Sequence, residues 1–148
     1  MQLLSQLPSV DAALLRGWLE RFANALRARD PSAAAQLFQP HVIGFGSVAR
    51  STTSLEELQS QQWAAIWPRS TGFAFETDPW VALSSDGCTV VIAAQWTSTG
   101  YHADGQPFER PGRCSLVLLR SSRDATWLAA HTHFSLVPGT PPVTFEPP

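Results

Sequence analysis

The chain has 148 residues, of which 44% are hydrophobic and only 15% are charged, and its formal net charge is −2 at pH 7. This length fits one domain with a substantial core. The slightly negative charge provides no basic field that would hold nucleic acid or an anionic membrane. Because so few charged residues are available to cover a monomer, the composition also favours self-association.

The sequence gives no sign of export or membrane insertion. Residues 1–8 lack the basic region and the long apolar run of a secretory leader, and no stretch approaches the length of a membrane span. Cys88 and Cys114 lack the spacing of metal ligands, so we expect both thiols to be reduced and buried. These observations predict a cytoplasmic protein.

The first third of the chain predicts two helices. Ser9 is a suitable cap for a helix that runs to about Arg29. Apolar residues recur three and four positions apart along this helix and form one stripe: Leu14, Leu15, Trp18, Leu19, Phe22, Ala25 and Leu26. Asp30 and Pro31 then have the residue types of an N-cap and a first helical position, which predicts a short second helix over residues 31–38.

A short strand and a third helix are expected next. Pro40 ends the second helix, and residues 41–46 have the apolar character of a strand. The third helix begins at Ser54, with Glu57 three positions later completing a capping box, and ends at Pro68.

The second half predicts strands and turns. Residues 73–77 alternate with a period of two, and Val, Ile, Trp and Thr are frequent in the later segments. We expect strands over residues 73–77, 80–83, 88–99, 113–120 and 127–136. Helices followed by mostly antiparallel strands predict a single α+β domain over residues 1–137. The five prolines of residues 138–148 predict an extended C-terminal tail.

Five short motifs, taken in order, carry a family resemblance. They are Ala25–Asp30 followed by Leu37-Phe38, Gln39–Phe45, Asp78–Val81, Asp104–Pro107, and the closing His131-Thr132-His133-Phe134-Ser135. Over residues 10–135 the chain resembles the nuclear transport factor 2-like (NTF2-like) superfamily. The nearest groups are the SnoaL-like proteins and the association domain of calcium/calmodulin-dependent kinase II. The resemblance implies a cystatin-like cone, in which a curved, mostly antiparallel sheet packs around three N-terminal helices.

The resemblance also indicates what is missing from the site. Steroid isomerases of this superfamily use a Tyr, an Asp base and a protonated Asp, and the matching positions here are Phe22, Gly46 and Leu116. The polar cavity positions of the kinase association domain fall on Gly46, Trp96, Leu116 and Gln59. Phe, Gly, Trp and Leu side chains cannot transfer a proton. The resemblance therefore implies a cavity without the isomerase chemistry.

We expect an apolar, aromatic cavity with a few polar contacts, among them Asn24. The candidate ligand-binding residues are Phe22, Gln59, Trp63, Trp67, Trp96, Cys114, Leu116, Thr132 and Phe134. No catalytic residue and no cofactor is assigned.

His131 and His133 lie two positions apart on the last strand and so share one face. A metal site there would lack a third ligand, so we expect no bound metal. The resemblance implies that Ala130, Thr132 and Phe134 face the cavity. The two histidines and Arg113 then face outward, on the side of the sheet where subunits pack. We therefore predict a homodimer built on the outer sheet face.

Two functions remain open. The first is a homodimeric module that binds a small apolar molecule or serves only in association. The alternative is a SnoaL-like isomerase or cyclase that acts on a polyketide- or steroid-like substrate. The missing carboxylates favour the first. The side chains that line the cavity distinguish the two, because an enzyme of this type needs a His, Asp or Glu there.

Overall fold

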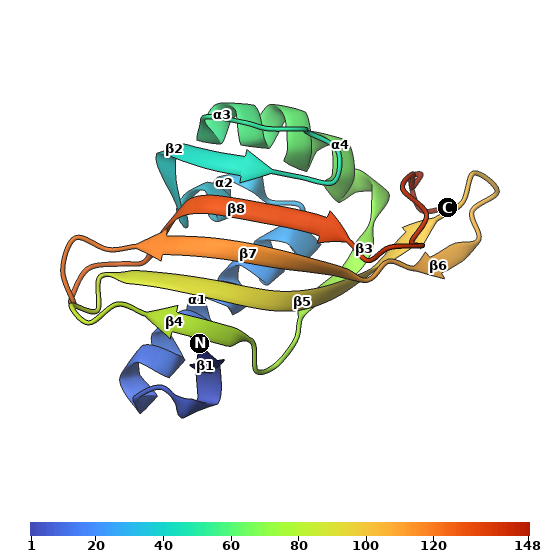
Figure 1. Cartoon of the computed structure of the whole chain (residues 1–148). Helices are drawn as coiled ribbons and strands as arrows, with labels where there is room; N and C mark the ends of the chain where they lie inside the picture. Colours follow the sequence, from blue (N-terminus) through green and yellow to red (C-terminus); the bar gives the residue numbers. More distant parts are fainter.

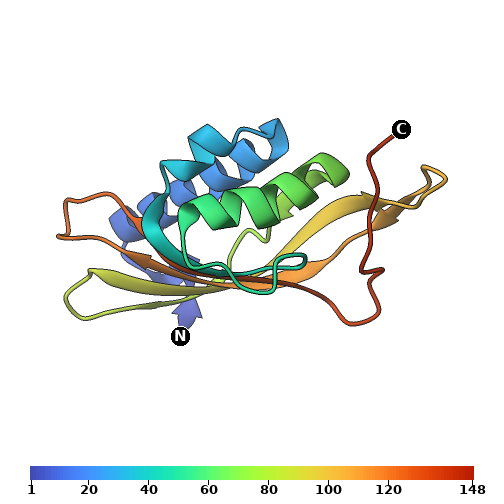
Figure 2. The same ribbon diagram turned by 90° about the horizontal axis from the view of Figure 1, so that it is seen from above.

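The computed structural model describes all 148 residues. They form one curved sheet with helices on its inner side (Figure 1). Figure 2 shows that the helices cover a single face of the sheet and that the opposite face carries none. This is the expected α+β cone, in which a mostly antiparallel sheet holds the N-terminal helices.

Helix α1 (Ser9–Ala28) is the central helix, and its apolar stripe is buried as the periodicity predicts. Its start differs from the prediction: Pro8 occupies the N-cap position, and no side chain caps the helix. Arg29 ends α1 in the left-handed conformation, with φ of 55°. Asp30 then caps the next helix, since its Oδ1 accepts a hydrogen bond of 2.9 Å from the backbone N–H of Ala33.

Helix α2 (Pro31–Ala35) is shorter than predicted, because strand β2 (Phe38–Phe45) begins where the helix was expected to end. Phe38 is buried and pairs with Ala129 of the last strand. Pairing in the sheet therefore overrides the helical continuation. It also places Phe38 over the cavity.

The third helical segment is continuous but irregular. It comprises α3 (Leu55–Glu57), a π-helical turn η2 (Leu58–Trp63), α4 (Ala64–Ile66) and a 3-10 turn η3 (Trp67–Arg69), so Pro68 lies within the last turn. Half of the predicted capping box is present: Ser54 Oγ accepts from Glu57 N, but Glu57 Oε2 accepts from Thr53 N and not from the N-cap residue Ser54. The wide π turn buries Leu58, Gln62 and Trp63 together.

The sheet follows the order β1-β4-β5-β7-β8-β2, and β3 and β6 pair with other parts of the long strand β5. All pairs are antiparallel except β2 with β8. Strands β1 and β6 were not predicted, because two or three residues are too few to show a pattern. The strands besides β2 are β1 (Gln2–Leu3), β3 (Thr71–Phe75), β4 (Trp80–Leu83), β5 (Thr89–Tyr101), β6 (Pro107–Glu109), β7 (Gly112–Leu119) and β8 (Leu128–Leu136).

A buried ion pair closes the end of the sheet where β7 finishes. Arg120 Nη2 lies 3.2 Å from Asp11 Oδ1 of α1, and Arg120 Nε donates to the carbonyl oxygen of Gly87 at 2.7 Å. The guanidinium carbon also lies 4.3 Å from the centre of the Trp127 ring. Of the guanidinium nitrogens, buried Nη1 has no partner. The pair joins the first helix to the last hairpin.

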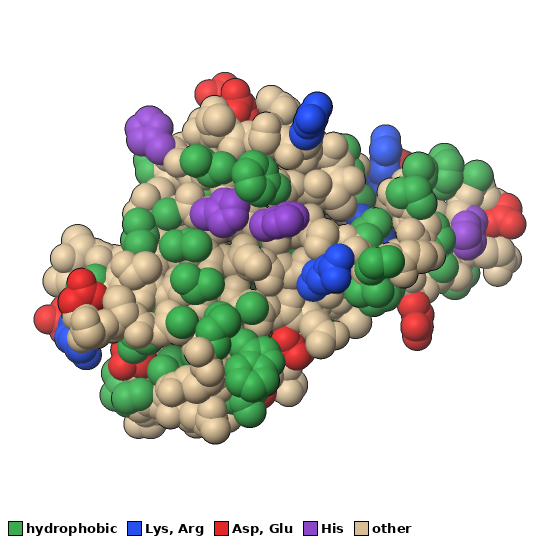
Figure 3. Space-filling model, viewed as in Figure 1, with side chains coloured by type: hydrophobic (Ala, Val, Ile, Leu, Met, Phe, Trp, Pro, Cys, Tyr) green, Lys and Arg blue, Asp and Glu red, His purple; other side chains and the backbone are tan.

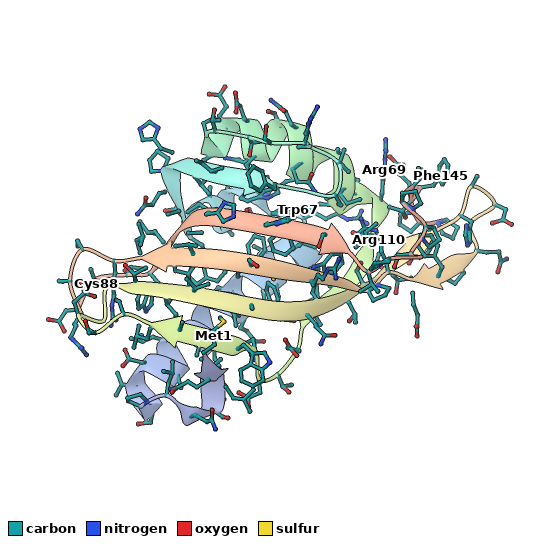
Figure 4. All side chains as sticks on the ribbon, in the orientation of Figure 1. Met1, Trp67, Arg69, Cys88, Arg110 and Phe145 are labelled. Carbon is teal, nitrogen blue, oxygen red and sulfur yellow. The ribbon has the colours of Figure 1, made fainter.

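The C-terminal residues 138–148 contain no helix or strand, and they pack against the far end of β5 (Figure 4). Thr144 is buried, and its Oγ1 accepts from Tyr101 N and donates to the carbonyl oxygen of Arg69, each at 2.8 Å. Phe145 N donates to the carbonyl oxygen of Tyr101. Residues near the C-terminus thus fasten the end of the third helical segment to β5. None of the helices combines the length and the apolar character that crossing a membrane requires.

Candidate functional site

A cavity lies between α1, the third helical segment and the inner face of the sheet. The volume open to the centres of water-sized molecules is about 50 Å³, room for only a few water molecules, and the total space not filled by atoms, open solvent included, is about 570 Å³. The lining residues come from six parts of the chain: Phe22, Leu26, Phe38, Phe45, Gly46, Ser47, Leu58, Gln62, Trp63, Ile66, Trp67, Ser70, Phe73, Trp96, Ser98, Arg110, Thr132 and Phe134.

Aromatic rings form most of the wall. Trp63 and Trp67 stack with ring centres 4.7 Å apart and planes inclined by 15°. Phe22 contacts both of them and also Phe134, at centre-to-centre distances between 6.1 and 6.4 Å. Such pairs add stabilisation beyond the area they bury. The wall is therefore a packed aromatic cluster suited to a flat apolar ligand.

Six of the nine candidate residues line this cavity: Phe22, Trp63, Trp67, Trp96, Thr132 and Phe134. Cys114 and Leu116 point to the inner side of the sheet but are packed in the hydrophobic core away from the cavity. Burial raises the pKa of the Cys114 thiol to about 12, so it stays protonated at neutral pH.

Gln59 and Asn24, which we expected among the polar contacts, do not line this cavity. Gln59 lines a separate shallow groove on the outer side of the helix, together with His41 and Pro31. The π turn brings Gln62 to the cavity instead, because it changes the helical repeat between these two residues. Asn24 is exposed and accepts a hydrogen bond from Arg27.

Gln62 occupies the position where the resemblance would place an isomerase base. A Cβ atom added to Gly46 would lie only 2.1 Å from Gln62 Oε1. This oxygen already accepts hydrogen bonds from the backbone N–H groups of Val48, at 3.0 Å, and Ala49, at 2.7 Å. The amide therefore holds the loop after β2 in place of a catalytic carboxylate.

Arg110 is the second polar residue that sequence reasoning missed. It is 3% exposed and lies in the turn before β7 (Figure 4). Its guanidinium carbon is 5.5 Å from the centre of the Trp96 ring, and Nη2 donates to Ser47 Oγ at 3.2 Å. Burial lowers the pKa of Arg110 to about 10, which leaves it a cation at neutral pH. The sequence Glu109-Arg110-Pro111 has the composition of a surface turn, so no local pattern indicated burial.

The cavity can donate hydrogen bonds but contains no carboxylate or imidazole. None of its lining residues is Asp, Glu or His, and Arg110 is the one ionisable group among them. No three His, Cys, Asp or Glu side chains in the structure lie close enough together to form a metal site. The cavity therefore lacks a side chain that would abstract a proton from carbon at neutral pH.

His131 and His133 lie on the outer face of the sheet, away from the cavity. Nδ1 of His131 is 3.0 Å from the carbonyl oxygen of Ile43, and both imidazole rings meet the ring of Phe45 edge to face. Arg113 also lies on this face, where its Nε donates to Ser135 Oγ at 3.4 Å. The three interface candidates therefore share one surface.

That surface carries two cross-strand rows of mainly apolar residues (Figure 3). The strand pairings define both rows. One contains Trp80, Ala93, Ser115, His133 and Phe45, and the other contains Ala82, Val91, Val117, His131 and Ile43. Four of these side chains are large, apolar and exposed by 36% to 52%: Val91, Phe45, Ile43 and Trp80.

Comparison with known families identifies the family to which the chain belongs. Residues 15–139 match the family model described as the SnoaL-like domain. The protein therefore belongs to the SnoaL-like family. No curated protein matches it.

Solved structures support the same fold. An NTF2-like superfamily protein from Salmonella enterica is 18% identical, with a TM-score of 0.72, over 90% of this chain and 95% of that one. A candidate calcium/calmodulin-dependent protein kinase II association domain from Xanthomonas campestris is 23% identical, with a TM-score of 0.68, over 87% and 86%. A ketosteroid isomerase-like protein from Erwinia carotovora atroseptica is 13% identical, with a TM-score of 0.71, over 84% and 95%. At these identities the similarity establishes the fold alone.

Proposed function

We propose that this SnoaL-like protein binds a small, mainly apolar molecule in its aromatic cavity and does not carry out steroid-type proton transfer. The observation that carries the proposal is the lining of the cavity, which is aromatic and contains no carboxylate or imidazole. An isomerase or cyclase mechanism based on general acid–base catalysis needs such a group, which typically contributes on the order of a hundredfold to ten-thousandfold to the rate.

A titration with a neutral aromatic probe, 2-naphthylmethanol, tests the proposal. Three of the six tryptophans, Trp63, Trp67 and Trp96, line the cavity, so binding should shift the intrinsic fluorescence. Trp96→Phe should weaken binding by about fivefold, because roughly 40 Å² of apolar contact at 25 cal/mol per Å² corresponds to about 1 kcal/mol. Trp80→Phe is the matched control, since Trp80 is 52% exposed on the other face of the sheet.

Two results would contradict the binding proposal. One is an unchanged spectrum with every apolar probe up to its solubility limit. The other is turnover of a β,γ-unsaturated ketone that disappears when a cavity residue is replaced, which would support the enzymatic alternative.

We also propose that a second copy of this chain covers the outer face of the sheet. When helices cover one face of a sheet and water covers the other, the side chains on the water-covered face are usually polar. Here the two rows across β4, β5, β7, β8 and β2 are mainly apolar, and the exposed Trp80, Phe45 and Ile43 lie at their ends. Contiguous apolar patches of this kind mark interaction surfaces.

Sedimentation at micromolar concentration should give twice the chain mass of 16.1 kDa. Val91→Glu places a charge within one row, between Ala82 and Val117, and should shift the protein to a monomer, because a carboxylate would be buried without a partner. Val143→Glu, on the exposed C-terminal segment, is the matched control and should leave the dimer intact. A monomeric wild-type protein, or a dimeric Val91→Glu variant, would refute this interface.

A further inference from the structure

The chain buries two arginines, Arg110 and Arg120, and only Arg120 has a carboxylate partner. Arg120 forms an ion pair with Asp11 and also donates to a backbone carbonyl oxygen. Arg110 is buried as deeply but has no carboxylate within 4 Å. Each guanidinium lies over a tryptophan ring, Trp127 for Arg120 and Trp96 for Arg110. Arg110 therefore has the same aromatic support as Arg120 without the counter-charge.

The Ser47 hydroxyl is the one side-chain acceptor for the Arg110 guanidinium, and it also accepts from Gln62 Nε2. Arg110 donates its single side-chain hydrogen bond to this hydroxyl, and its Nε is buried without a partner. Trp96 Nε1 is also buried without a partner. The Ser98 hydroxyl lies on the same cavity wall, and the backbone of Ser98 exchanges two hydrogen bonds with that of Arg110. Such a set leaves positive charge and N–H groups to be satisfied by an acceptor.

A buried, unpaired cation is costly unless something compensates it, because removing a charge from water carries a large penalty. An anion held by a guanidinium makes short, charge-assisted hydrogen bonds that offset this penalty. Since no protein carboxylate lies within 4 Å of Arg110, an anion that enters the cavity would supply the missing counter-charge.

We propose that the ligand of this cavity is an apolar or aromatic carboxylate whose anionic group binds Arg110 while its apolar body lies against the aromatic wall. This inference rests on the proposed binding function and deepens it, because it assigns the chemical class of the ligand. Arg110 is the anion-binding residue, with Ser47 beside it, and Phe22, Trp63 and Trp67 contact the apolar body. The space available inside the cavity is small and the cavity opens to solvent, so part of the ligand extends out of it.

Calorimetric titration with matched acids and amides tests the assignment. The probes are 2-naphthoate and 2-naphthamide, which share shape and apolar area and differ in charge. The wild-type protein should bind the acid about tenfold to a hundredfold more tightly, as expected for hydrogen bonds to a charged group. Acetate, which lacks the apolar body, should bind far more weakly than 2-naphthoate.

Variants of Arg110 test whether the preference for the acid over the amide depends on this residue. Arg110→Met should reduce the acid-to-amide ratio to about one, and Arg110→Lys should keep part of it because it keeps the charge. Arg50→Met is the control, since Arg50 is an exposed arginine on the loop that adjoins the cavity. That variant should retain the full ratio if the selectivity comes from Arg110 and not from the general field of the molecule.

Thermal unfolding separates an anion-binding role from a structural one. Removing an uncompensated buried charge should leave the midpoint of the ligand-free protein unchanged or raise it. A structural arginine would lower the midpoint on replacement, which would overturn the assignment. Equal binding of acid and amide by the wild type, or an unchanged ratio in Arg110→Met, would overturn it as well. Those results would leave the binding function intact, whereas failure of the acid, the amide and 2-naphthylmethanol alike would remove both.

Discussion

Replacing Gly112 by Ala should lower the free energy of unfolding by about 3 kcal/mol, the upper end of the usual range for overpacking. A Cβ atom at this position would lie 2.0 Å from Trp96 Cζ2 and 2.7 Å from the backbone oxygen of Ser135. The backbone oxygen belongs to the paired strand β8 and cannot rotate away. The indole would have to move, and with it the cation–π contact to Arg110.

Urea unfolding measures this change, and Gly17→Ala is its control. Gly17 lies in the middle of α1 with nothing within 4 Å of an added Cβ. That substitution should stabilise the protein by up to about 1 kcal/mol, the difference in helix propensity. Effects of equal size or sign for the two glycines would show that Gly112 does not set the position of Trp96.

The second large effect is expected for Asp11→Ala, which should cost about 3 to 5 kcal/mol. The substitution leaves the Arg120 guanidinium, whose side chain is 1% exposed, without its carboxylate. The hydrogen bond to Gly87 and the contact with Trp127 do not neutralise the charge. The loss should be partly reversed by the double variant Asp11→Ala/Arg120→Met, because a buried apolar side chain needs no counter-charge.

An exposed pair provides the comparison for Asp11. Arg16 Nη2 lies 3.9 Å from Asp78 Oδ1 at the surface. Arg16→Ala should leave the thermal midpoint unchanged within error, because water and salt screen exposed pairs. If Asp11→Ala were equally mild, water would have to reach Arg120.

These two effects depend on contacts that the sequence does not reveal, whereas the main elements follow from local patterns. The apolar repeat along α1, the Asp30 and Ser54 caps, and the alternation of residues 128–136 all predict the observed elements. The same alternation places His131 and His133 on one face and Thr132 and Phe134 on the other. Family resemblance adds the arrangement of these elements as a cone, which residue patterns alone do not specify.

The candidate site was harder to predict, for two physical reasons. Because of the π turn at Leu58–Trp63, Gln62 lies at the cavity and Gln59 does not. The apolar pattern of a helix does not reveal a single wide turn. Arg110 lies between two strands and beside Pro111, where sequence composition indicates an exposed turn. It is buried because Trp96, Ser47 and Ser98 come from distant parts of the chain to cover it.

The parallel pairing of β2 with β8 has a consequence for how the molecule is made. Strand β2 (Phe38–Phe45) is synthesised before β3 to β7, but β8 (Leu128–Leu136), which joins it to the rest of the sheet, follows all of them in the chain. Until then β2 lacks its neighbour in the sheet, and the cavity lacks Thr132 and Phe134. A nascent chain therefore carries an unpaired strand edge until β8 has been made, which exposes it to misassociation and makes the closing of the sheet a long-range step.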